Sequence, residues 1–210
     1  MSAAEATVGQ RVMVHHYQGC TQCAHCRSGW QQLCQEVPVK VYGSNSHGGH
    51  AQYICVPANT LVPLPDELSF SAGAAISCGS GTAWGALRRM NVSGRDTIAI
   101  FGQGPVGLAA TQFAKALGAK VIALDISDQS GGQTNAPKNF HFETYDGYTL
   151  NLSENSVDLA FSYQFLEHVH PDDHEDHFRT VLRFLRPGGA YIFDTPHKYS
   201  GPHDASFLFA

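Results

Sequence analysis

Four cysteines near the N-terminus have the spacing of a metal site. The spacing is C-x2-C-x2-C-x7-C, and the residues are Cys20, Cys23, Cys26 and Cys34. Four thiolates that reach one point complete the tetrahedral shell of Zn²⁺ and leave no open position for a substrate. The spacing therefore predicts a structural zinc site in a loop too polar to have a hydrophobic core. An iron–sulfur cluster is the alternative, since thiolate spacing alone does not exclude it.

A glycine-rich turn further along the chain could bind a dinucleotide. Its G-x-G-x-x-G motif spans residues 102–107, and the residues expected to contact the ligand are Gly102, Gly104, Pro105, Val106 and Gly107. The first glycine allows a tight turn, the second lets the backbone approach a pyrophosphate, and the third lets the helix pack on the strand. Asp125 ends the next apolar run, where a carboxylate accepts bonds from ribose hydroxyls and disfavours a 2′-phosphate. The pattern predicts NAD(H) binding, and the alternative is a turn that folds correctly but binds nothing.

The order of the elements predicts an α/β chain. The first part has short β-rich runs at 11–15, 37–42 and 51–56, then a loop that leads into a helix at 69–84. From residue 97 to 124 a strand–helix–strand unit implies parallel strands and a right-handed crossover. A Gly/Ser/Asn/Pro linker follows at 128–138. Beyond it we expect strands at 139–144, 157–162 and 190–193, with a helix at about 173–184 that ends at an Arg-Pro-Gly-Gly turn.

Composition excludes several classes of protein. Hydrophobic residues make up 43% of the chain and charged residues 15%, which is not the composition of a disordered segment. A net charge of -5 argues against nucleic-acid binding, and no apolar run approaches the roughly 18 residues of a membrane span. Residues 1–10 do not resemble a secretory signal, so we expect a cytoplasmic protein with reduced thiols. Between residues 139 and 178 every formal charge is acidic, which indicates that the two halves of the chain differ in origin.

The N-terminal half resembles the zinc-dependent medium-chain alcohol dehydrogenase family. The likeness rests on GQRVMVHHYQGCTQCAHCRSGWQQLC, AQYICVP, AAISCGSGTAWGAL and IAIFGQGPVGLAATQFAKALGAKVIALD, and it covers about Val8–Asp125. It implies a GroES-like substrate domain that carries the structural zinc lobe, followed by a nucleotide-binding domain. It also implies that Thr82 would lie against the nicotinamide ring.

The same resemblance implies a second, catalytic zinc, for which Cys78 would be the third ligand. The family's first two ligands, a Cys and a His, normally precede the strand that begins here at Arg11, so we expect the chain to lack them. None of the histidines at 15, 16, 47 and 50 sits in the matching motif. Because a catalytic zinc needs three protein ligands, we expect Cys78 to be vestigial.

After Asp125 the chain resembles a class I S-adenosylmethionine-dependent methyltransferase. The likeness rests on APKNFHFETYDGYTL, SVDLAFSYQFLEHVHPDD and LRFLRPGGAYIFDTPH, and it covers roughly Ala136–Phe209. It implies that Asp146 would lie near the adenine of S-adenosylmethionine, which is therefore an alternative cofactor. The family usually carries an acid two residues before the first glycine of its turn, and Ile100 stands there.

These observations predict a hybrid of two α/β families. We expect a GroES-like β remnant with a structural zinc lobe at 1–84, followed by a Rossmann-like doubly wound parallel sheet at 85–210. In that second domain, 85–127 is dehydrogenase-like and 128–210 methyltransferase-like. The leading functional hypothesis is a zinc-binding, NAD-dependent alcohol dehydrogenase-like oxidoreductase, truncated or fused, without a complete catalytic zinc site. A methyltransferase and a non-catalytic zinc- and nucleotide-binding fragment are the alternatives. The expected partner is a small molecule, with a homo-oligomer left open.

Overall fold

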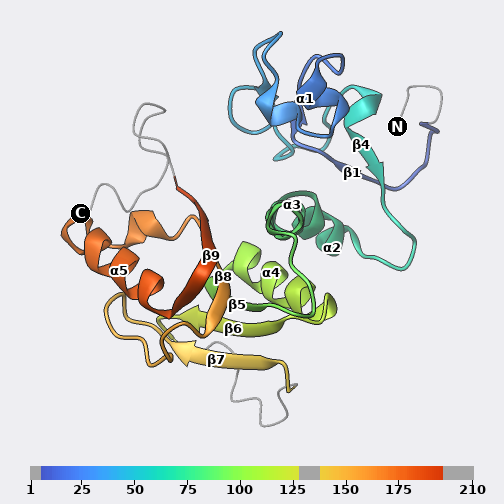
Figure 1. Ribbon diagram of the computed structural model, residues 1–210. Coiled ribbons are helices and arrows are strands. Elements are labelled where there is room, and N and C mark those ends of the chain that lie inside the picture. The colour runs from blue at the N-terminus through green and yellow to red at the C-terminus, as the bar shows by residue number, and fades with distance from the viewer. Residues whose placement is uncertain (1–5, 128–137, 196–210) are drawn as a thin grey trace. The chain divides into compact units, whose positions relative to one another are not determined.

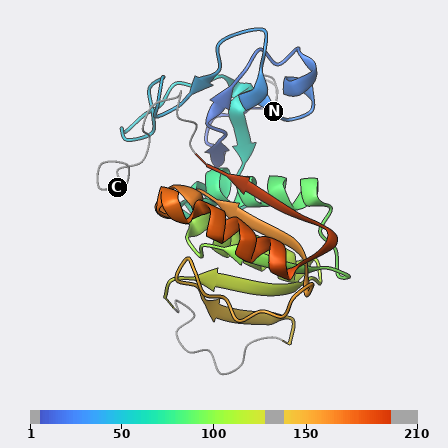
Figure 2. The same cartoon turned by 60° about the vertical axis from the view of Figure 1, so that its left-hand side comes forward.

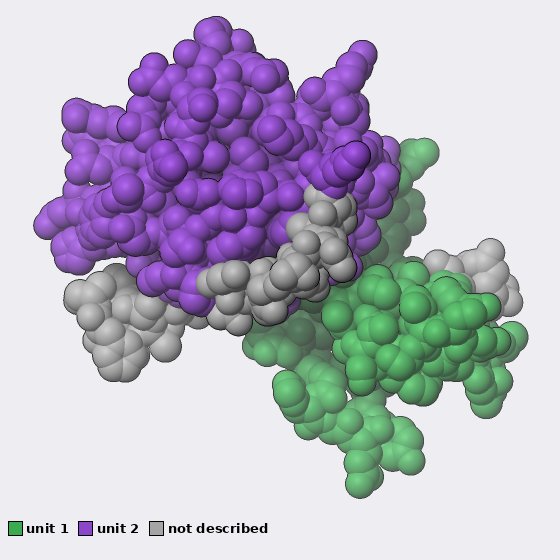
Figure 3. Space-filling view, turned by 90° about the horizontal axis from the view of Figure 1, so that it is seen from below, with its two compact units in different colours: residues 1–81 green, residues 82–210 purple. Residues whose placement is uncertain are grey.

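The chain divides into two compact units, residues 1–81 and 82–210 (Figure 3). The computed structural model describes residues 6–127 and 138–195. The linker predicted at 128–138 lies almost wholly outside the described residues, as does the end of the methyltransferase-like segment after residue 195. In the described part, no helix has both the length and the apolar character needed to cross a membrane.

Unit 1 is built from two short antiparallel ladders and several brief helices (Figure 1). Strand β1 (Val12–Val14) pairs with β4 (Leu61–Pro63), and β2 (Tyr17–Gln18) pairs with β3 (Lys40–Val41). Its helices are α1 (Ala24–Arg27), α2 (Phe70–Ala75) and the 3₁₀ turns Gln31–Leu33 and Ala58–Thr60. Arg11 ties the start of β1 to the segment before α2, because its guanidinium donates to the carbonyl oxygens of Pro65 and Leu68 at 2.9 and 2.5 Å.

Two expectations for unit 1 were wrong. No strand forms at 51–56, where Tyr53 is 89% exposed and the backbone has no ladder. An alternating pattern makes a strand only when a neighbouring strand accepts its hydrogen bonds, and none does so within the described residues. The loop expected before the helix is itself helical. Ser69 caps α2 by accepting the Ala72 N–H at 3.1 Å, and a π-helical turn, Ile76–Ser80, leads into α3 (Gly81–Met90).

Unit 2 is a doubly wound parallel sheet of five strands in the order β7-β6-β5-β8-β9. Its strands are β5 (Thr97–Phe101), β6 (Lys120–Asp125), β7 (Phe140–Thr144), β8 (Val157–Tyr163) and β9 (Leu185–Asp194). Its helices are α3, α4 (Pro105–Ala116) and α5 (His174–Phe184), with 3₁₀ turns at Leu166–His168 and Pro171–Asp173. From β5 the chain runs to β6 and β7 on one side, and it then returns to β8 and β9 on the other side of β5. This reversal places a switch point between β5 and β8, where ligands bind in such sheets.

Each face of this sheet has its own core, because alternate residues of a strand point to opposite sides. Ile98 and Ile100 pack with α3 and α4, whereas Ala99 and Phe101 pack with α5. Figure 2 shows α5 lying along one face of the sheet. The predicted α/β fold with a Rossmann-like parallel sheet is confirmed.

The last strand differs from its prediction. The sequence indicated a turn at Arg-Pro-Gly-Gly and a strand at 190–193, but β9 begins at Leu185. Gly188 has a φ of +84°, and the pairing with β8 shifts register between Val157 and Leu159. The motif is therefore an irregularity within the strand. Pro187 is tolerated because β9 lies at the edge of the sheet, where a missing N–H costs no ladder bond.

Candidate functional site

The four predicted cysteines come together in unit 1. The sulfur atoms of Cys20, Cys23, Cys26 and Cys34 all lie within 4.8 Å of one another, and those of Cys20 and Cys26 are 3.9 Å apart. Tetrahedral Zn–S bonds of about 2.3 Å place two sulfurs about 3.8 Å apart, so this cluster has the right size for a zinc ion. Donor type, number and spacing thus fit a closed structural site.

Local backbone geometry gathers these sulfurs. Cys23 is the N-cap of α1 and accepts the Cys26 N–H at 3.5 Å, while Cys34 accepts the Cys20 N–H at 3.4 Å. Gly19 lies against the cluster, and a Cβ there would stand 2.6 Å from the Cys26 sulfur. Its N–H donates to the Gln31 side chain at 3.1 Å. Only a glycine lets the chain approach the sulfurs so closely, so the loop is shaped around them.

The same backbone groups favour thiolates at two of the four positions. The N–H groups of Cys20 and Val37 lower the pKa of the Cys34 thiol to about 6. The N–H of Cys26 lowers the pKa of Cys23. Burial raises the pKa of Cys26 to about 12, because a thiolate loses its hydration when the sulfur is buried. A bound cation would supply a counter-ion for that thiolate, which again fits a metal site.

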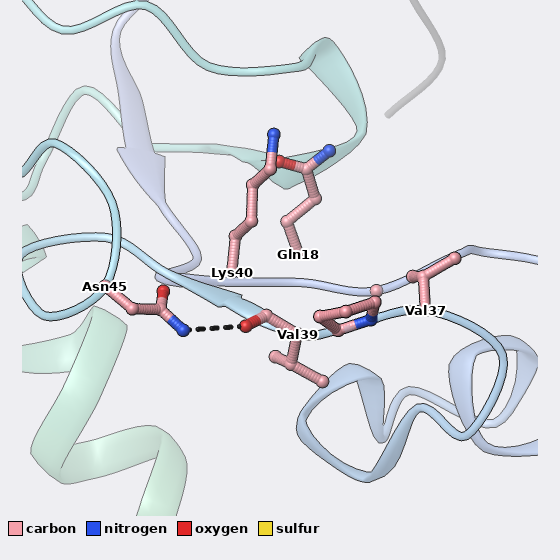
Figure 4. Close-up of a pocket in the computed structure, with 7 residues that line it drawn as sticks. Gln18, Val37, Val39, Lys40 and Asn45 are labelled. Carbon is pink, nitrogen blue, oxygen red and sulfur yellow. Dashed lines mark hydrogen bonds between the residues drawn. The ribbon is translucent and has the colours of Figure 1, made fainter.

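A shallow pocket of about 420 Å³ lies next to this loop (Figure 4). Its lining is Gln18, Gly19, Val37, Pro38, Val39, Lys40 and Asn45. Asn45 braces the wall by donating to the Val39 carbonyl oxygen at 3.0 Å. None of these residues was predicted to bind a ligand.

The glycine turn of unit 2 lies between β5 and α4, at the switch point of the sheet. Gly102 has a φ of +80°, which favours glycine, and its N–H donates to the Leu124 carbonyl oxygen at 2.8 Å. A Cβ at Gly107 would meet the Gly102 carbonyl oxygen at 1.8 Å, whereas one at Gly104 would meet nothing within 4 Å. Gly104 is the N-cap of α4, where no side chain caps the helix, and Pro105 and Val106 begin its first turn.

Asp125 braces this turn from the end of β6. Its carboxylate accepts the Gln103 N–H at 2.5 Å and the Ile126 N–H at 2.8 Å. Each oxygen accepts one of these bonds and keeps a further lone-pair site for a ligand hydroxyl. The structure thus places Asp125 beside the turn, as the motif predicts.

Sequence reasoning missed Gln103, the variable residue between two of the glycines. Its side chain is buried and donates to the carbonyl oxygens of Ile100 and Gly102 at 3.1 and 3.2 Å. Thr111 of α4 donates to its oxygen at 2.9 Å. Gln103 therefore fastens strand, turn and helix together. The motif gives no signal for it because its pattern leaves this position open.

The remaining predicted residues do not form a centre with one another. Cys78 is exposed in the π-helical turn, and Thr82 lies in the first turn of α3. In the described part of the chain, the four-cysteine cluster is the one group of three or more potential metal ligands. Asp146 is exposed, and the N–H groups of Thr149 and Tyr148 bond to its side chain and lower its pKa. That carboxylate has a structural role in its turn.

Two family models match separate parts of the chain. Residues 2–66 match the alcohol dehydrogenase GroES-like domain, and residues 101–193 match a methyltransferase domain. The second match begins at residue 101 rather than near 136, so it includes the glycine turn and β6. The N-terminal part is thus a GroES-like domain of the alcohol dehydrogenase type, and the predicted resemblance to both families is confirmed.

Individual known proteins are similar to this chain in sequence or in structure. The uncharacterized zinc-type alcohol dehydrogenase-like protein YphC of Escherichia coli (strain K12) is 44% identical over 119 residues, which are 56% of this chain and 34% of that protein. The chain therefore spans about a third of that curated relative. Alcohol dehydrogenase TADH from Thermus sp. ATN1 has a TM-score of 0.70 at 25% identity over 97% of this chain and 60% of that one. Acetophenone reductase from Geotrichum candidum NBRC 4597, solved in complex with NAD, has a TM-score of 0.69 at 23% identity over 92% of this chain and 57% of that one.

These structural likenesses extend through the residues that match the methyltransferase model. Both families build a parallel sheet with helices on both faces, so a splice between them preserves the alternation of strand and helix. The chain is thus similar to a zinc-type alcohol dehydrogenase-like protein in sequence over 119 residues and to alcohol dehydrogenases in fold.

Proposed function

We propose that the chain is a zinc-binding, alcohol dehydrogenase-like protein that binds NAD(H) at the turn after β5. One observation carries this proposal. The space around the Cβ position of Gly104 is free of other atoms, and Gly104 lies at the N-terminus of α4, where no side chain caps the helix. A twelve-residue helix presents free N–H groups and the positive end of its dipole there. A pyrophosphate approaching over Gly104 would meet no side chain. Asp125, at the end of β6, would accept bonds from the adenosine ribose.

The zinc of this proposal is structural. Held by Cys20, Cys23, Cys26 and Cys34, it would fix the 19–34 loop and take no part in a reaction, because four sulfurs fill its coordination shell. Hydride transfer in zinc-type dehydrogenases needs a second metal with an open position. Within the described residues Cys78 has no two further ligands gathered around it. We therefore propose that the chain, fused to a methyltransferase-like segment, does not oxidise alcohols.

The first test of this proposal is enzymatic. With zinc-loaded protein, NAD⁺ and a panel of primary and secondary alcohols, we expect no NADH absorbance at 340 nm above that of a protein-free control. The reason is that Cys78 alone does not ligate the metal that would hold an alkoxide against the nicotinamide. Turnover that disappears in Cys78→Ser, together with a second tightly bound zinc per chain, would contradict the proposal.

A specific observation favours S-adenosylmethionine as the second candidate ligand. The methyltransferase model covers residues 101–193 and so includes β6, β7, β8 and all of β9 except its last residue, but only the last residue of β5. Against it stands Ile100, which is fully buried in the core beside α3 and α4. The acid that would bind the ligand's methionine arm in that family is therefore replaced by an apolar side chain.

Calorimetric titration of each ligand into the zinc-loaded protein separates the two candidates. We expect NADH to bind more tightly than S-adenosylmethionine but still weakly. Its binding free energy should be about −4 kcal/mol, which corresponds to a millimolar dissociation constant. Asp125→Ala should weaken both ligands, since both carry the adenosine ribose. A clear preference for S-adenosylmethionine would move the function to the methyltransferase side. Binding of neither ligand would leave a zinc-bearing fragment without a nucleotide site.

A further inference from the structure

Four side chains of unit 2 form a continuous hydrogen-bond chain in its interior. His177 of α5 is 0% exposed. Its Nδ1 atom lies 2.9 Å from the hydroxyl oxygen of Tyr145, and its Nε2 atom lies 3.1 Å from that of Tyr191 on β9. At one end, Ser162 Oγ of β8 lies 2.8 Å from the Tyr191 oxygen. At the other end, the Tyr145 hydroxyl donates to the Gly147 carbonyl oxygen at 2.7 Å.

The direction of every bond follows from the hydrogens available. A carbonyl oxygen only accepts, so the Tyr145 hydroxyl donates its one hydrogen to Gly147 and can only accept a hydrogen bond from His177. Nδ1 of His177 must then carry the ring proton. In the neutral ring Nε2 is bare, so Tyr191 donates to it and Ser162 donates to Tyr191. With His177 neutral, every hydrogen in the chain has an acceptor.

The surroundings of the imidazole favour this neutral form. Rings of Phe101 on β5, Phe165 after β8 and Phe178 on α5 have centroids 5.3, 5.6 and 5.6 Å from it. Tyr145, just after β7, and Tyr191, on β9, also face the imidazole. Burial raises the pKa of both phenols, so neither supplies a negative charge. Burial, and then His174 on the same helix, lower the pKa of His177 to about 4.

A proton added to Nε2 would disturb the Tyr191–Ser162 end of the hydrogen-bond chain. The new N–H would point at the Tyr191 hydrogen, so Tyr191 would have to turn its hydrogen to Ser162. Ser162 would then lose the acceptor for its own hydrogen. The positive charge would lie among aromatic rings, and no carboxylate belongs to the chain to offset its desolvation.

The hydrogen-bond chain holds the turn that carries Asp146, a residue predicted to lie near a ligand. Tyr145 and Gly147 flank Asp146, so the Tyr145 hydroxyl closes that turn from the inside, while Asp146 Oδ1 accepts the N–H groups of Tyr148 and Thr149 from the outside at 2.9 and 2.7 Å. His177 attaches this turn to α5, and Tyr191 attaches α5 to the sheet. Loss of the central imidazole bonds would free the helix and the turn together.

We propose that this hydrogen-bond chain is an acid-sensitive latch that holds α5 and the turn at residues 145–149 on the sheet at neutral pH and releases both in acid. His177 thus acts as a positioning residue for the turn. The latch does not depend on which nucleotide, if any, the turn helps to bind.

The sign of the pH dependence follows from linkage. The unfolded chain takes up the proton near its ordinary pKa of 6.5, whereas the folded chain does so near 4. The stability contributed by the neutral ring is therefore complete above about pH 6.5 and is lost as the pH falls toward about 4. Between pH 7.5 and pH 5, these two values correspond to an increase of about 30-fold in the open population.

Two measurements on the unaltered, ligand-free protein test the latch. In ¹⁵N spectra at pH 7.5 we expect His177 to be neutral with its proton on Nδ1. In hydrogen exchange corrected for intrinsic rates, amides of α5 and of 145–149 should lose about 30-fold of their protection between pH 7.5 and 5, while those of β5 change little. A charged ring, or a proton on Nε2 at pH 7.5, would overturn the proposal.

A matched pair of variants tests whether His177 is the sensor. His177→Phe removes the titrating group and keeps an aromatic ring in the cluster, and Tyr191 can then donate to Ser162. We expect the acid-dependent loss of protection to vanish in this variant. His141→Gln changes an exposed histidine on β7 and should retain the loss. An equal loss of protection in His177→Phe and in the unaltered chain would refute the latch. If His177→Phe does not fold, the ¹⁵N spectra of the unaltered protein still test the proposal through the charge and the proton position of His177.

Discussion

Replacing Cys26 by serine is expected to leave the purified protein without bound zinc, compared with about one zinc per chain before the change. Cys26 is the buried ligand, 8% exposed, and its sulfur lies 3.9 Å from that of Cys20. A serine hydroxyl stays protonated near neutral pH and ligates zinc poorly, so the shell would keep only three sulfurs.

The loss should extend to the structure of the loop. Binding of a structural zinc is worth on the order of 10 kcal/mol to the folding of small zinc domains, and this loop has few other buried contacts. We expect residues 19–34 to become sensitive to limited proteolysis and to exchange their amide hydrogens rapidly. The sheet of unit 2 has its own two cores and should keep its protection.

Cys55→Ser is the matched control for this experiment. Cys55 is exposed and lies outside the cluster, so its replacement should leave the zinc content and the loop unchanged. Zinc is best measured by elemental analysis of protein purified without added metal. A full equivalent of zinc in Cys26→Ser would contradict the assignment of the site, and iron with inorganic sulfide in the unaltered chain would favour the cluster alternative.

The parallel sheet was predictable because its signals are local. Thr97–Phe101 is an apolar run closed by a glycine turn, and β5 has the same bounds. Central strands buried on both faces give such runs, and the helix between two of them has its own period. The cysteine cluster was predictable for the same reason, since its four ligands lie within fifteen consecutive positions.

The features that were missed depend on contacts distant in sequence. Residues 51–56 alternate like a strand, but no neighbour pairs with them in the described part of the chain. The chain through His177 joins residues from 145 to 191, and no local pattern marks a histidine that two tyrosines will enclose. Gln103 was missed because a variable motif position does not reveal that its side chain is buried.

Replacement by alanine should affect the fold at one glycine of this turn and ligand binding at another. At Gly107 a Cβ would stand 1.8 Å from the Gly102 carbonyl oxygen, and this backbone atom cannot move without opening the turn. We expect Gly107→Ala to destabilise unit 2 by about 3 kcal/mol or more, at the upper end of the usual cost of overpacking. The measurement is chemical denaturation followed by the fluorescence of Trp84, which lies in this unit, in a background where the other tryptophan is removed by Trp30→Phe.

Gly104→Ala should instead spare the fold and impair the ligand. Gly104 has a φ of −67° that any residue adopts, and no atom lies within 4 Å of its Cβ position. Alanine is a poorer N-cap than glycine, so we expect a loss of about 1 kcal/mol at most. A methyl group there would block the approach of the pyrophosphate, and NADH affinity should fall at least about tenfold, about 1.4 kcal/mol. S-adenosylmethionine has no pyrophosphate and should be affected less. If Gly104→Ala binds NADH as well as the unaltered chain does, the nucleotide does not lie over this turn, and the proposed function fails at the step that carries it.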